Sequence, residues 1–145
     1  MTITKIKRQQ CKKTLYHYLK EHAENTPEKV WLSSEREAVT FREALDRVES
    51  VAVQFLACGM KKGDLLALRA TRCIDTVLLT VAAASIGAVA ALTDPHFPVE
   101  AYLFDSGVKM TADFILTNED AGEGISAGGN WKLSGGGRTW PLAFA

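Results

Sequence analysis

The sequence is poor in the residues that build disulfide frameworks and metal sites. Its three cysteines, Cys11, Cys58 and Cys73, are widely spaced and include no Cys-x-x-Cys pair. This pattern argues against a disulfide framework and a zinc site. We expect Cys58 and Cys73 to be small buried hydrophobic residues in a reducing compartment. Basic and acidic residues both number 17, so no overall charge favours a nucleic-acid partner.

Long hydrophobic runs are also missing. The longest, Val77–Leu92, is interrupted by Thr80, Ser85 and Gly87, and it falls short of the roughly 20 apolar residues of a membrane-spanning helix. No secretory apolar region follows the start. We therefore expect a cytoplasmic protein without a transmembrane span.

Acidic residues are absent from the first twenty positions, which hold six basic ones. Such a segment is typical of an organelle transit peptide or a nucleic-acid-binding arm. Transit peptides are rich in Arg and Ser, however, and this segment has one Arg and no Ser. We interpret residues 1–13 as a solvated basic N-terminal segment and expect no nucleic-acid partner.

Helical and strand patterns alternate over residues 14–118. A first helix is predicted to begin after Thr14 and to end before Pro27. The segment Thr40–Glu43 is a capping box, whose two side chains satisfy backbone N–H groups at a helix start, and Gly59 supplies a left-handed stop. The apolar face of this helix comprises Phe41, Ala44, Leu45, Val48, Ala52, Phe55 and Leu56.

The other predicted elements are shorter and complete an α/β fold. Strands alternating with helices predict a mostly parallel sheet with flanking helices and a short hairpin near the start. The run Val89–Leu92 has the pattern of a strand covered on both faces. The hairpin strands are expected at Val30–Leu32 and Ala38–Val39, further strands at Leu65–Leu68 and Ala112–Thr117, and helices at Ile74–Ile86 and Pro98–Asp105.

The pattern changes after Asn118. Seven of the 11 glycines lie between Gly122 and Gly137, and hydrophobic periodicity disappears. We predict an irregular Gly-rich tail over residues 119–145. Its Trp131 and Trp140 are costly to leave in water, which indicates a segment meant to pack against structure outside this chain.

Phosphate-binding and nucleophile motifs are not found. Gly122–Gly124 begins like a dinucleotide fingerprint, but the third glycine is displaced. Neither Gly129–Trp131 nor Gly137–Thr139 fits the Gly-Lys-Ser/Thr of a Walker loop. No Gly-x-Ser-x-Gly elbow occurs.

Metal ligands and paired carboxylates receive structural interpretations. The three histidines, His17, His22 and His96, lack metal-ligand spacing. Asp94 is interpreted as a turn residue that binds its own backbone, and Glu100 as a favourable charge at a helix start. Asp64 and Asp105 have the same turn and helix-end interpretations. We therefore predict no catalytic, cofactor-binding or metal residue.

Four segments resemble, in order, landmarks of the adenylate-forming ligases, which include acyl-CoA synthetases and peptide-synthetase adenylation domains. Leu15–Pro27 resembles their opening helix, and Val39–Ala44 is similar to their Leu-Thr-Tyr-x-Glu-Leu block. Gly59–Asp64 resembles their Gly-x-x-x-Gly-Asp turn. Ile86–Lys109 resembles their Gly-Ala-x-x-x-Pro-x-Asp-Pro-x-x-Pro block, with Ala91–Thr93 departing from the usual Val-Pro.

The resemblance implies an N-terminal subdomain of such a ligase. Complete members join a carboxylic acid to ATP as an acyl-adenylate, with magnesium, and usually pass the acyl group to coenzyme A or a carrier thiol. Their phosphate loop, acidic magnesium ligand and C-terminal lysine have no counterpart in this sequence. The resemblance thus implies a chain that binds no cofactor itself and is inactive alone.

Two other hypotheses remain open. The chain is alternatively a stand-alone α/β binding or interaction module without catalysis. An incomplete parallel sheet leaves an unpaired edge, which invites self-association. A flavodoxin-like nucleotide binder requires a phosphate loop after the first strand, and Ser33–Arg36 matches one poorly.

Overall fold

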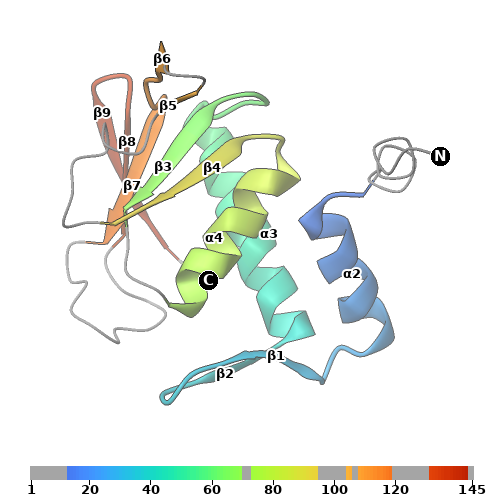
Figure 1. Cartoon of the computed structure of the whole chain (residues 1–145). Coiled ribbons are helices and arrows are strands. Elements are labelled where there is room, and N and C mark those ends of the chain that lie inside the picture. Colours follow the sequence, from blue (N-terminus) through green and yellow to red (C-terminus); the bar gives the residue numbers. More distant parts are fainter. Residues whose placement is uncertain (1–12, 70–72, 95–103, 106–107, 119–130, 144–145) are drawn as a thin grey trace.

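The computed structural model describes residues 13–69, 73–94, 104–105, 108–118 and 131–143. It contains a five-stranded sheet with helices α3 and α4 against one face, and α2 packs on these two helices (Figure 1). A two-stranded hairpin, β1–β2, lies beside the start of α3. The elements are α2 Leu15–Asn25, β1 Val30–Ser33, β2 Ala38–Thr40, α3 Phe41–Ala57, β3 Leu65–Arg69, α4 Ile74–Ser85, β4 Val89–Thr93, β5 Phe104–Asp105, β6 Val108–Lys109, β7 Phe114–Asn118, β8 Trp131–Gly135 and β9 Arg138–Leu142.

The sheet has the strand order β4-β3-β7-β8-β9. Strand β3 pairs in parallel with β4 and with β7, whereas β8 pairs antiparallel with β7 and with β9. The predicted α/β fold with an early hairpin is therefore confirmed. The expectation of a mostly parallel sheet holds for β4, β3 and β7 and not for the two strands that follow.

Helix α3 begins at the predicted capping box. The Thr40 hydroxyl accepts a hydrogen bond from the Glu43 N–H at 3.2 Å, and the Glu43 carboxylate accepts one from the Thr40 N–H at 3.1 Å. The bond from the Thr40 backbone holds the pKa of Glu43 below its usual value. Gly59 follows the helix with φ +92°, as a left-handed stop requires.

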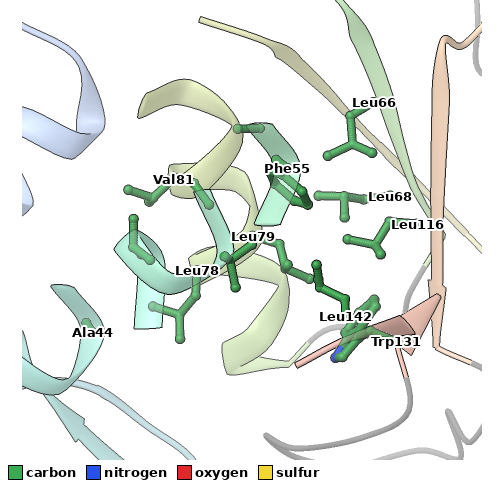
Figure 2. Close-up of a cluster of buried hydrophobic side chains, with 14 of the residues drawn as sticks. Ala44, Phe55, Leu66, Leu68, Leu78, Leu79, Val81, Leu116, Trp131 and Leu142 are labelled. Atoms are coloured by element: carbon green, nitrogen blue, oxygen red, sulfur yellow. The ribbon is translucent and has the colours of Figure 1, made fainter. Parts of the chain in front are cut away.

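The buried face of α3 differs from the prediction near the end of the helix, where the predicted Ala52 is only partly buried. Leu56 is 55% exposed, and Val51 is buried instead. The core lies between this helix, α4 and the sheet. Figure 2 shows the sheet side chains Leu66, Leu68 and Leu116 directed toward Phe55 and Leu79. Burial of such apolar side chains is the main source of stability.

The sequence predicts that the strand at Val89–Leu92 is covered on both faces. In the structure this strand, β4, is not. Val89 and Leu92 are 55% and 59% exposed. The reason is topological, because β4 is the edge strand and pairs, among the described residues, with β3 alone. An uninterrupted apolar run does not reveal whether a strand is central or at the edge.

The predicted irregular tail is wrong for residues 131–142, which form the β8–β9 hairpin. Gly136 and Gly137 have φ of +57° and +77°, the sign that a two-residue hairpin turn requires. Trp131 packs in the core of this chain rather than against structure outside it. The rest of the predicted tail, 119–130 and 144–145, lies outside the described residues.

The predicted helix Pro98–Asp105 falls largely outside the described residues. Its last two positions, Phe104–Asp105, form β5, which pairs antiparallel with β6. The predicted helix at Ile74–Ile86 is confirmed as α4, which ends one residue earlier.

Replacing Thr40 by Ala removes one acceptor of the α3 capping box. We expect the free energy of unfolding to fall by about 1 kcal/mol, the usual cost of losing such a cap. Urea denaturation followed by circular dichroism measures it. Thr111→Ala, at an exposed position outside helices and strands, is the matched control, and an equal loss in both variants would contradict the assignment.

Candidate functional site

The sequence analysis considered three histidines as metal ligands. The two that the structure describes make structural contacts. His17 completes a capping box on α2, in which its Nδ1 accepts a hydrogen bond from the Thr14 N–H at 3.2 Å. The His22 ring stacks on Phe41 with centroids 4.8 Å apart. His96 lies outside the described residues.

The acidic candidates are similarly engaged in local structure. Asp64 accepts a hydrogen bond from the Lys61 N–H at 2.9 Å, as its interpretation as a turn residue predicts. Asp94 is exposed directly after β4. Asp105 belongs to strand β5, so its interpretation as a helix-end residue is wrong. Glu100 lies outside the described residues.

Cys58 and Cys73 are free and half-buried. Burial raises the pKa of the Cys58 thiol, which keeps it in its weakly nucleophilic protonated form. The Cys73 sulfur lies 3.3 Å from the Thr76 hydroxyl at the start of α4. The expected burial of these two cysteines is therefore only partial. Cys11 lies outside the described residues.

Within the described part of the chain, no group of three or more His, Cys, Asp or Glu side chains is placed to hold a metal ion. No described helix has the length and hydrophobicity needed to span a membrane.

One polar feature that the sequence analysis missed lies inside the core. Asp75, in the first turn of α4, is only 1% exposed. Its Oδ2 accepts a hydrogen bond from the indole N–H of Trp131 at 3.0 Å, across 56 residues of sequence. Its Oδ1 is buried and has no hydrogen-bond partner in the described structure. The signal in the sequence was one carboxylate in a helix with no other charged residue, and this carboxylate resembles an ordinary helix-start charge.

Two further charges influence Asp75. Burial raises the pKa of this carboxyl, and the negative charge of Glu37 raises it further, whereas the indole hydrogen bond and the Arg47 charge lower it. Arg47 and Glu37 form a half-buried ion pair, with 3.7 Å between Nη1 and Oε1. This cluster joins α4, α3, β8 and the β1–β2 turn. The contacts in this cluster join side chains of different elements to one another, as expected of a structural cluster.

A shallow apolar groove runs between α2, α4 and β1. It consists of two adjoining cavities of about 230 and 250 Å³, which share Leu15, Trp31 and Val81. The polar groups of its lining residues are the Tyr18, Thr76 and Thr80 hydroxyls, the His22 ring and the Trp31 indole N–H. Thr80 donates to the Thr76 carbonyl at 2.8 Å. Such a lining suits apolar packing and offers little to a phosphate.

Three of the described carboxylates are hydrogen-bonded to other groups of the protein. Oxygen ligands from carboxylates are what Mg²⁺ prefers, yet Asp64 and Asp75 bind groups of the protein itself. Asp113 does so too, since its Oδ2 accepts from the Leu65 N–H at 2.8 Å.

Comparison with known proteins gives one family match. The model of the AMP-binding enzyme family matches residues 19–118. The acetoacetyl-CoA synthetase of Xenopus tropicalis is 40% identical over 107 residues, which cover 70% of this chain and 16% of that protein. Surfactin synthase subunit 1 of Bacillus subtilis is 30% identical over 101 residues, or 68% of this chain and 3% of that one.

The fold agrees with that match. The N-terminal subdomain of NpsA from Klebsiella oxytoca superposes with a TM-score of 0.57 at 24% identity, over 62% of this chain and 23% of that one. The chain thus spans a small part of the length of the proteins it resembles. The matched family segment ends at residue 118, before β8 begins.

Replacing Asp75 by Asn tests the buried carboxyl. Its pKa is higher in the folded state, so the folded protein binds more protons between the unfolded and folded pKa values. The free energy of unfolding therefore falls as pH rises through that window and stays lower above it. Asn retains an oxygen acceptor for the Trp131 indole and cannot ionise, so we expect this fall to disappear and stability at neutral pH to be kept or raised.

Urea unfolding from acid to neutral pH measures this effect. Asp46→Asn, at an exposed carboxylate paired with Arg42, is the matched control and should leave the fall in place. An Asp75→Asn variant with the parental pH dependence would contradict the assignment.

Proposed function

Since the chain belongs to the AMP-binding enzyme family, we propose that it is the N-terminal scaffold of an adenylate-forming ligase and is inactive by itself. The observation that carries the proposal is the family match over 19–118 on a chain that covers 16% of acetoacetyl-CoA synthetase. The complete protein would activate a carboxylic acid with ATP and pass the acyl group to a thiol.

The chemistry supports the inactivity of this portion alone. Forming an acyl-adenylate requires groups that neutralise phosphate charge while the carboxylate attacks, together with a bound metal ion. The described carboxylates Asp64, Asp75 and Asp113 already bind groups of the protein. The described portion therefore serves to support parts of the site supplied by other residues.

Relatives indicate two classes of thiol as the acceptor of the acyl group. One is an acetoacetyl-CoA synthetase and another a 2-succinylbenzoate–CoA ligase, which favours coenzyme A, whereas surfactin synthase subunit 1 favours a carrier-bound thiol. The free thiols of Cys58 and Cys73 fit a reducing, cytoplasmic location.

ATP–pyrophosphate exchange tests the proposal. We expect the purified chain to exchange no more label than a heat-denatured sample, with a panel of aliphatic and aromatic acids. Exchange that depends on an added acid would overturn the inactivity. The DNA downstream provides a separate test, because a reading frame encoding Ser-Gly-Ser/Thr-Thr-Gly-x-Pro-Lys would establish the scaffold interpretation.

A second proposal concerns association through the edge strand β4. Its exposed Val89 and Leu92 lie on a strand that pairs, in the described structure, on one side only. Unprotected edges of this kind recruit strands from other chains.

Val89→Lys should weaken such association, because a charged side chain on an edge strand opposes strand pairing. Light scattering at increasing protein concentration measures it. Val53→Lys, at a 66% exposed position on α3, is the control and should leave the association unchanged. A chain that stays monomeric throughout would refute this proposal.

A further inference from the structure

The β8–β9 hairpin lies beyond the segment that matches the family, yet it belongs to the main core. Trp131 and Leu133 are 1% and 0% exposed, and Leu142 is also buried. All three join the cluster that α3, α4 and the other strands form. Figure 2 shows Trp131 and Leu142 in this cluster. The hairpin is therefore an integral part of the fold.

Backbone pairing joins the hairpin to the sheet along one edge of β7, from its second residue to its last. The antiparallel register runs from Ile115 opposite Ser134 to Asn118 opposite Trp131. Without β8, this edge of β7 would present unpaired backbone groups, which proteins normally cover. The hairpin thus occupies the position at which another strand could pair with this edge of β7.

Side chains hold the hairpin at both of its strands. At β8, the Trp131 indole donates to buried Asp75 at 3.0 Å. After β9, the Gln54 side chain of α3 binds both backbone groups of Ala143: it donates to the carbonyl at 2.6 Å and accepts from the N–H at 3.0 Å. The Gln54 amide thus makes the same two hydrogen bonds to the Ala143 backbone that a neighbouring strand would make.

The turn end of the hairpin fits closely against β7. A Cβ atom on Gly135 would lie 2.5 Å from Cδ1 of the Phe114 ring and 2.9 Å from the Asp113 carbonyl oxygen. The Trp140 and Phe114 rings are 6.3 Å apart between centroids. Only glycine at 135 permits this approach.

We infer that the β7 edge, together with Asp75 and Gln54, is a strand-acceptor surface whose occupant is the chain's own segment 131–143. The chain's own residues therefore cover this edge of β7. An extended segment of another polypeptide can pair with β7 only after displacing the hairpin. This inference stands on contacts within the chain and does not rest on the proposed function.

Hydrogen exchange of the unaltered chain is the first test. The amides of β8 should be protected as strongly as those of β3, because both strands lie in one cooperative sheet. Exchange of β8 amides at the rate of an unfolded segment would overturn the inference.

Trp131 fluorescence is the second measurement. In a Trp31→Phe, Trp140→Phe background the remaining indole should emit at short wavelength and resist acrylamide quenching. In urea its transition should coincide with the helical circular dichroism. Loss of the Trp131 signal well before the helices unfold would overturn the inference, and the exchange measurement decides the matter should this background fail to fold.

Substitution at Gly135 tests whether the hairpin contributes to the stability of the whole fold. Gly135→Val places side-chain atoms within the Phe114 ring, so it should lower the midpoints of the fluorescence and circular-dichroism transitions together. Thr139→Val, at an exposed position of β9, should change neither. A Gly135→Val chain with the parental helical midpoint would contradict the inference.

Dilution distinguishes closure within one chain from exchange between two copies. A monomer whose β8 amides stay protected at every concentration supports the assignment. Protection that is lost on dilution would show that a second copy supplies the hairpin, and would overturn closure within the chain.

Discussion

The arrangement of this protein depends on the burial of helix α4. Its buried residues include Ile74, Leu78, Leu79 and Val81, which point in several directions around the helix axis. Such a helix is stable only when neighbours cover most of its circumference. The sheet, α3 and α2 provide that cover, and α2 packs against both helices. The layered order of the molecule follows from this requirement.

Burial of α4 also explains the importance of its one carboxylate. Asp75 enters the core with the apolar side chains around it, where an unpaired polar group is expensive. The Trp131 indole satisfies one of its oxygens, so a residue far along the chain completes the environment of the helix. A polar contact of this kind favours one docking geometry for the hairpin over alternatives that apolar packing alone would permit.

Family membership and the described chemistry point in the same direction. The matched segment contains the helices and parallel strands of an adenylation-type subdomain, and its polar residues serve as caps and turns, with Asp75 held in the core. Among the described residues, no group of three or more His, Cys, Asp or Glu side chains is placed to hold a metal ion. The hairpin β8–β9 adds a second property, because it extends the sheet beyond β7 with residues that lie outside the family segment.

The sequence by itself determined the local elements and the family. Helix α3 is one example, with its Thr40–Glu43 capping box and its Gly59 stop. These features depend on contacts between near neighbours in the chain, so the order of residues is enough to predict them. The tertiary structure alone decided that β4 lies at an edge, that 131–142 forms two strands, and that Asp75 meets Trp131. Each of these features depends on contacts between residues that are far apart in the chain. Asp75 and Trp131, for example, are separated by 56 positions. Hydrophobic periodicity does not identify which distant residues will be in contact.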